Sequence, residues 1–88
     1  MATSWQRQRT PNIGSLVDLN NPAPGYYLVK GDARYFIGAI ISEPSLNRVA
    51  ERVLSDRTGW NYWVDYCMGR DVTGRAAWAN VDKTDLFI

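Results

Sequence analysis

The fold is decided by one aromatic stretch, residues 60–68, which reads WNYWVDYCM between Gly59 and Gly69. Large aromatic and β-branched side chains pack well on a pleated surface, so this stretch predicts a central β-strand. Side chains alternate along a strand, which divides the stretch into two faces. One face is apolar and aromatic and must lie against other residues: Trp60, Tyr62, Val64, Tyr66 and Met68. The other mixes one Trp with polar groups and can reach solvent: Asn61, Trp63, Asp65 and Cys67.

The length of the chain limits it to one domain. A core built from 88 residues cannot usefully be divided. Apolar residues make up 45% and charged residues 22%, which is the balance of an ordinary globular protein. Residues 1–12 are polar and carry Arg7 and Arg9 without any acid, so they predict a flexible basic N-terminal arm. Residues 13–88 are then predicted to form a single α+β domain.

The cysteine count and the hydropathy indicate the compartment. The single Cys67 cannot form an internal disulfide, which is typical of a reducing interior. No apolar run approaches the ~18–20 residues that cross a bilayer. We therefore expect a cytoplasmic protein with no membrane partner.

The side chains that carry most enzyme chemistry are scarce. With no His and one Cys, the usual zinc and copper ligand sets cannot be assembled from one chain, so we expect no metal and no cofactor. The missing His also removes the commonest general base and any activating neighbour for Cys67, which is interpreted as interior. Asp65 lies between aromatic residues, but no second carboxylate in the same strand pairs with it. The sequence predicts a protein that is not an enzyme.

Two strands are predicted before the aromatic stretch. Residues 26–30 and 34–42 indicate an antiparallel hairpin joined through Gly31. The second strand is apolar on both faces, as in the middle of a sheet or in a small closed barrel. Residues 13–19 predict a short turn or edge strand, and residues 20–25 a loop with two prolines.

The clearest helix begins near residues 42–45 and is predicted to end at Gly59. Its apolar stripe has helical spacing and consists of Leu46, Val49, Ala50, Val53 and Leu54. Ser42 or Ser45 can cap the first turn, which tolerates Pro44. The opposite face is either solvated or in contact with phosphate or an acidic partner, and its arginines are Arg48, Arg52 and Arg57.

The last third of the chain predicts a hairpin and one further strand. Residues 69–75 indicate a tip, and residues 76–81 a strand that pairs back on the aromatic stretch. Residues 82–85 predict a turn and residues 86–88 a final short strand. The predicted fold is α+β. It is a small, strongly bent antiparallel sheet or a five-stranded barrel, with one amphipathic helix inserted between the second and third strands.

From residue 26 onward, this order of elements resembles the small barrel of Tudor-like domains. The segments that carry the resemblance are WVDY at 63–66, AWANV at 77–81, and Asp85-Leu86. The resemblance implies a five-stranded barrel with an aromatic cage, in which the cation of a methylated side chain lies against ring faces. The candidate cage consists of Trp60, Tyr62 and Tyr66. An α+β sheet with the helix packed across one face explains the same pattern.

The aromatic residues favour a binding surface. Four Trp and five Tyr exceed what one small face buries, and exposed Trp and Tyr beside Arg are typical of protein interfaces. The leading hypothesis is a small accessory protein that contacts a protein partner, or itself in a homo-oligomer, through an aromatic sheet surface. Its predicted contact residues are Trp60, Tyr62, Trp63, Tyr66 and Trp78.

Two alternatives stay open. One is a small nucleic-acid-binding barrel whose affinity falls with salt, although a net charge of +1 does not indicate a uniformly basic surface. Its candidate contacts are Arg7, Arg9, Arg48, Arg52 and Arg57. The other is an oligomeric enzyme whose substrate binds in a shared central pore.

Overall fold

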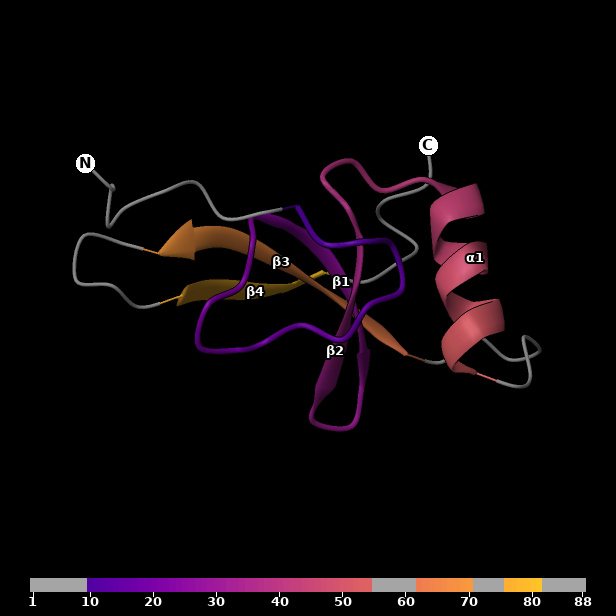
Figure 1. Cartoon of the computed structure of the whole chain (residues 1–88), viewed down its shortest axis with the longest axis horizontal. Helices are drawn as coiled ribbons and strands as arrows, with labels where there is room; N and C mark the ends of the chain where they lie inside the picture. Colours follow the sequence, from indigo (N-terminus) through magenta and orange to yellow (C-terminus); the bar gives the residue numbers. More distant parts are fainter. Residues whose placement is uncertain (1–9, 55–61, 71–75, 82–88) are drawn as a thin grey trace.

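The computed structural model describes residues 10–54, 62–70 and 76–81. In chain order its elements are β1 (Gly25–Lys30), β2 (Ala33–Gly38), α1 (Glu43–Val53), β3 (Trp63–Arg70) and β4 (Ala76–Val81). The strands form one antiparallel, four-stranded sheet in the order β2-β1-β3-β4, and α1 lies at one end of it (Figure 1). This confirms a small α+β domain with its helix between the second and third strands.

The sheet is bent, and its described strands do not close. In Figure 1 the β1–β2 hairpin runs at a steep angle to the β3–β4 hairpin, which extends away from α1. Among the described residues the two outer strands of the sheet are β2 and β4. The final strand expected at residues 86–88 lies outside the described residues. At 11 residues α1 is too short to cross a bilayer, and the described ranges contain no other helix that could.

Register divides the sheet into two faces, because directly paired residues point the same way. The helix face carries Leu28 opposite Val64, and Tyr26 opposite Tyr66. The other face carries Tyr27 opposite Asp65 and Val29 opposite Trp63, in the same β1–β3 ladder. We call it the strap face, because residues of the segment 13–17, the strap described below, pack against its buried cluster. The alternation predicted along the aromatic stretch is therefore confirmed from Trp63 to Cys67.

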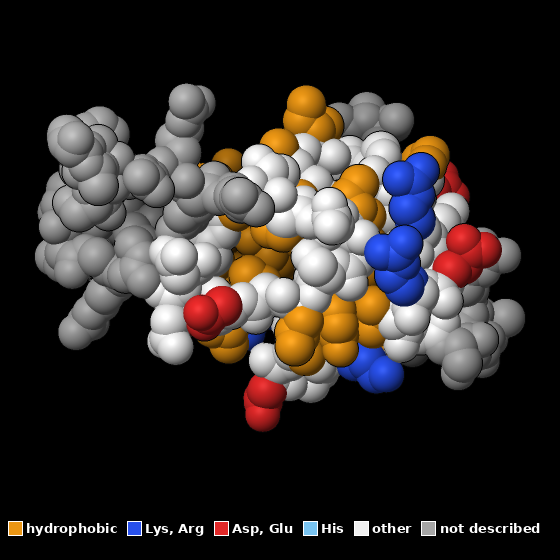
Figure 2. Space-filling model, viewed as in Figure 1, with side chains coloured by type: hydrophobic (Ala, Val, Ile, Leu, Met, Phe, Trp, Pro, Cys, Tyr) orange, Lys and Arg blue, Asp and Glu red, His pale blue; other side chains and the backbone are white. Residues whose placement is uncertain are grey.

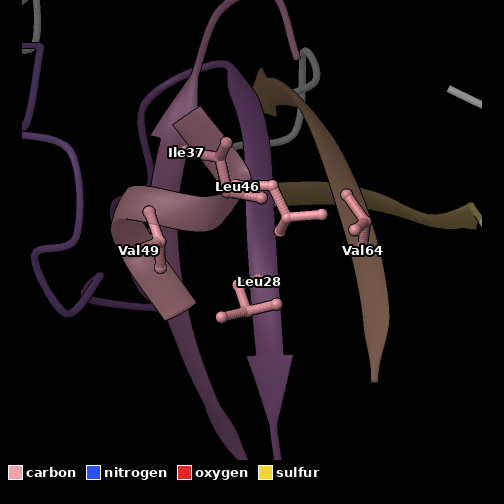
Figure 3. Close-up of a cluster of buried hydrophobic side chains, with 5 residues drawn as sticks. All are labelled: Leu28, Ile37, Leu46, Val49 and Val64. Atoms are coloured by element: carbon pink, nitrogen blue, oxygen red, sulfur yellow. The ribbon is translucent and has the colours of Figure 1, made fainter. Parts of the chain in front are cut away.

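The main core lies between α1 and the helix face of the sheet. Its buried side chains come from three strands and the helix and point toward one another in Figure 3: Leu28, Ile37, Leu46, Val49 and Val64. The helix begins as predicted, because the Ser42 side chain accepts a hydrogen bond from the Ser45 amide at 3.3 Å. Pro44 occupies the first turn, where its missing amide hydrogen costs little.

The helix ends earlier than predicted. Its last residue is Val53, and Leu54 is already extended at φ −111° and ψ 130°, so the predicted end at Gly59 is wrong. The apolar stripe stops at Leu54, and the next four residues in sequence are Ser, Asp, Arg and Thr. Three of these are poor helix formers because their side chains compete for backbone hydrogen bonds. These four residues also offer no apolar face whose burial could stabilise a longer helix.

Strand β2 is also shorter than predicted. It ends at Gly38 rather than continuing to residue 42, because Gly38 adopts φ +146°, which side-chain-bearing residues rarely adopt. Ile40 beyond it is 84% exposed. Among the described strands β2 is an outer strand and not a mid-sheet strand, and its expected place in a closed barrel stays a prediction. Its apolar character has another cause: Ile37 is buried under α1, and Phe36 is buried in a second cluster on the strap face.

Residues 13–17, which we call the strap, run along the outer edge of β2. The Gly14 amide donates to the Phe36 carbonyl at 2.7 Å, and the Val17 amide donates to the Arg34 carbonyl at 2.8 Å. A single antiparallel bridge joins Leu16 to Tyr35, so the segment expected as a short turn or edge strand contains a turn and one isolated bridge. The strap also meets the helix, because the Arg52 guanidinium donates to the Ile13 carbonyl at 3.1 Å. It therefore connects the sheet edge with α1.

The start of β1 requires glycine, and this gives a first prediction. Gly25 has φ +143°, and a Cβ there would lie 2.9 Å from both the Gly38 carbonyl oxygen and the Phe36 ring. We expect Gly25→Ala to lower the free energy of unfolding by at least about 2 kcal/mol, from backbone strain and the close contact together. Urea titration measures this loss. The matched control is Gly31→Ala, which also has positive φ but meets nothing within 4 Å. Equal losses would show that the close approach is unimportant.

Candidate functional site

Burial along β3 departs from the sequence-based expectation. Trp63 reaches solvent as expected, at 58% exposed, but Asp65 on the same face is completely buried. Met68 was expected to pack and is instead 72% exposed. The reason is that the two faces are covered at different places. The helix covers the end of its face near Val64, whereas a second cluster covers the opposite face further along β3.

This second cluster lies on the strap face around Tyr27. Phe36 and Cys67 are buried with it, and the ring of the half-buried Trp78 packs edge-on at 4.9 Å from the Tyr27 ring. The Tyr27 hydroxyl donates to the Ala23 carbonyl at 2.5 Å, and burial raises the pKa of this phenol to about 12. Cys67 is thus interior as predicted. Trp78, a predicted contact residue, is available to a partner only in part.

A buried ion pair lies next to this cluster. Asp65 on β3 accepts a hydrogen bond at 2.5 Å from Nε of Arg34, which reaches across from β2. The Asp65 side chain is 1% exposed and that of Arg34 is 23% exposed. The guanidinium carbon lies 5.0 Å from the centre of the Trp78 ring, a cation–π contact. Within the described residues, the second carboxylate oxygen of Asp65 has no hydrogen-bond partner.

An open pocket lies beside this ion pair on the strap face. It has a volume of about 170 Å³, and the described residues that line it are Val29, Trp63 and Asn80. Val29 pairs with Trp63 on one side and with Arg34 on the other, so the three residues form one row across β3, β1 and β2. Asn80 pairs with Asp65 in the next row. The pocket thus combines an exposed indole, an apolar floor and an amide, and the Arg34–Asp65 ion pair lies in the neighbouring positions of the sheet.

The other predicted aromatic contacts lie on the opposite face. Tyr66 packs against Tyr26 with ring centres 4.6 Å apart, and Tyr62 packs against the main core. Burial raises the pKa of the Tyr62 phenol to about 12. Tyr62 and Tyr66 therefore belong to the helix face, while Trp63 and Trp78 belong to the strap face. Trp60 lies outside the described residues, so its place in a cage with these tyrosines stays a prediction.

The structure describes two of the five arginines that were predicted to contact nucleic acid. Arg48 and Arg52 are exposed on α1, and Arg52 is bonded to the strap. In Figure 2 most of the Lys and Arg side chains on this face lie toward the α1 side of the molecule, where they adjoin hydrophobic side chains. Arg7, Arg9 and Arg57 lie outside the described residues. Nucleic-acid contact through these five arginines stays a prediction.

Sequence reasoning found one member of the pocket and missed the others. Trp63 was singled out by its place in the aromatic stretch, but Val29 and Asn80, the other described residues that line the pocket, come from two other strands. One signal pointed to a partner for Asp65, because a carboxylate set between aromatic residues in a strand requires a cation when buried. In residues 10–54, 62–70 and 76–81, no three His, Cys, Asp or Glu side chains gather where they could hold a metal ion.

Comparison with known proteins does not assign this site. No protein-family model matches the chain, and searches of curated proteins and of solved structures give no significant match. The function is therefore argued from the geometry of the site.

Proposed function

We propose that the chain is a small contact protein that binds a protein partner, or a second copy of itself, through the strap face around Trp63. The observation that carries this proposal is the exposure of Trp63, 58% of a large aromatic side chain, beside an open pocket lined by Val29 and Asn80. Tryptophan is enriched among the residues that contribute most to binding at protein interfaces. A pocket beside such a ring gives a partner side chain a place to anchor.

The burial of the neighbouring residues supports the same surface. Asp65 and Cys67 lie on the same strand face as Trp63 and are fully buried, so the backbone that carries the indole is held by a packed interior. A rigid aromatic side chain loses little conformational entropy on binding. Met68 is more exposed, at 72%, but it lies at the register irregularity between Cys67 and Arg70, does not line the pocket, and is a flexible thioether side chain. The strap face is therefore the better candidate.

Replacing Trp63 tests the proposal. We expect Trp63→Ala to weaken association at least about thirtyfold, because loss of a central Trp costs about 2 kcal/mol or more. Size-exclusion chromatography with light scattering, at low and moderate salt, measures self-association. If the wild-type chain is a monomer, the same variant is compared in affinity for the partner that co-purifies with it. Thermal unfolding should change little, since the ring is mostly exposed.

The matched control is Met68→Ala, which removes a more exposed side chain that does not line the pocket. It should leave association within about twofold of the wild type, as expected for exposed residues outside the energetic centre of an interface. An equal loss in both variants, or no loss in Trp63→Ala, would contradict the proposed surface.

The proposal keeps a finer alternative on the helix face. In it the sheet closes into a Tudor-like barrel, and Trp60, Tyr62 and Tyr66 form the cage. Binding of a methyl-lysine peptide that is lost in Tyr66→Ala and kept in Trp63→Ala would support the cage over the strap face. The light-scattering experiment also tests the alternative of an oligomeric enzyme, because a monomeric chain has no shared central pore.

A further inference from the structure

The proposed contact surface includes a cation held in a fixed position. Arg34 does not line the pocket, but it pairs with the lining residue Val29 and faces the same side of the sheet, and its ion-pair partner Asp65 pairs with the lining residue Asn80. Its Nε donates to Asp65, and its guanidinium lies over the Trp78 ring at 5.0 Å. Two contacts from different strands therefore hold the guanidinium group before any partner arrives.

Most of the donors of this guanidinium are unused. Arginine has five N–H donors, and the bond to Asp65 uses the one on Nε. In the part of the chain that the structure describes, the two terminal nitrogens make no hydrogen bond, and 23% of the side chain is exposed. The free oxygen of Asp65, by contrast, is buried and cannot be reached from solvent. The accessible polar chemistry beside the pocket is thus donation, which suits an anionic acceptor.

The surroundings indicate which kind of anion fits. Among the described residues the site offers one fixed cation rather than a cluster, and the whole chain has a net charge of only +1, so a polyanion gains little here. A carboxylate accepts two parallel hydrogen bonds from a guanidinium, and the Asn80 amide adds a further donor at the pocket. Val29 and Trp63 leave an apolar space that a bare anion would not fill.

We propose that this site binds an acidic side chain of a partner protein, with the carboxylate on the terminal nitrogens of Arg34 and a nearby apolar side chain of the same segment in the pocket beside Trp63. This inference rests on the proposed contact function and names the chemistry of the partner. In an extended partner segment, residues two apart point to the same side, which gives the spacing between the two side chains.

Two matched peptides test the inference on the intact wild-type chain. The first is acetyl-Gly-Phe-Ser-Glu-Gly-amide, and the second replaces its Glu with Gln. Affinities are measured by NMR from the indole N–H signal of Trp63, which is assigned by its loss in Trp63→Phe. The Glu peptide should bind at least about tenfold more tightly, because a charge-assisted hydrogen bond is lost with Gln. Inorganic phosphate, added as a competitor, should displace the Glu peptide only weakly.

Variants locate the effect. Arg34→Lys keeps a positive charge for Asp65 but lacks the planar set of donors, so it should reduce the preference for Glu over Gln to below about threefold. Asn80→Ala, at an exposed position, should weaken the Glu peptide while the unfolding midpoint stays unchanged. Met68→Ala is the control and should bind both peptides as the wild type does.

The outcomes separate this inference from the proposed function. Three results would overturn the inference of an acidic partner. They are equal affinity for the two peptides, no binding of either peptide, and phosphate that binds as tightly as the Glu peptide. If association of the full chain still depends on Trp63 in those cases, the contact function stands. If Trp63→Ala leaves association intact, the proposed contact function and the inference that rests on it both fail.

Discussion

Arg34→Ala is expected to lower the free energy of unfolding by about 3–5 kcal/mol, the usual result of removing one partner from a buried ion pair. Asp65 is completely buried, and Arg34 supplies its described ion-pair partner. Removing the guanidinium leaves a carboxylate that neither water nor a cation solvates. For a domain of this size, each kcal/mol corresponds to roughly 4–8 °C in the melting temperature. Calorimetry and urea titration should both show the loss.

The reverse substitution provides the control. In Asp65→Ala the remaining charge belongs to Arg34, whose side chain is 23% exposed and flexible enough to turn toward solvent. We therefore expect a smaller loss for Asp65→Ala than for Arg34→Ala. The double variant Arg34→Met with Asp65→Leu should be more stable than Arg34→Ala, because no uncompensated charge remains. The opposite order of the two single variants would show that the carboxylate is not effectively buried.

Leu28→Ala is expected to cost about 2–5 kcal/mol, through lost transfer free energy and the cavity left behind. Leu28 is fully buried at the centre of the sheet, opposite Val64 on β3 and Tyr35 on β2. Leu46 and Val49 of α1 complete the cluster above it (Figure 3). These neighbours come from three elements and cannot collapse together around a smaller side chain. Urea titration gives the change in free energy from the shift in midpoint at constant slope.

The next residue supplies a matched control for this cavity. Val29 also lies on β1, but it points to the strap face and is only partly buried, beside an open pocket. Val29→Ala should cost less than half as much as Leu28→Ala, because water can enter the space that it leaves. Similar costs for both variants would mean that the pocket is closed in solution.

Sequence reasoning worked where the deciding interactions are local. The position of α1 follows from the spacing of Leu46, Val49 and Ala50, and its start follows from Ser42. Strand alternation placed Val64 and Trp63 on opposite faces correctly. The end of the helix at Val53 was harder to predict, because Gly59 offered a recognisable stop signal in sequence. The loss of the apolar stripe before it was the stronger physical constraint.

Burial and the candidate site depend on contacts that no local pattern contains. Asp65 was expected to face solvent and is buried, because Arg34, 31 residues away in sequence, neutralises it. Val29 and Asn80 join Trp63 only through the register of two separate strand pairings. Alternation shows which residues share a face, but it does not show what covers that face. That second question is answered by the order of strands and by the path of the strap.

The strap has a consequence for the behaviour of the protein in a crowded solution. An uncovered outer strand presents a row of free amides and carbonyls that other chains can pair with, which leads to aggregation or strand exchange. On β2 the strap accepts and donates these hydrogen bonds, at Phe36 and Arg34. Arg52 holds its beginning at Ile13 against the helix. Residues 13–17 thus protect this sheet edge from templating the polymerisation of its own copies.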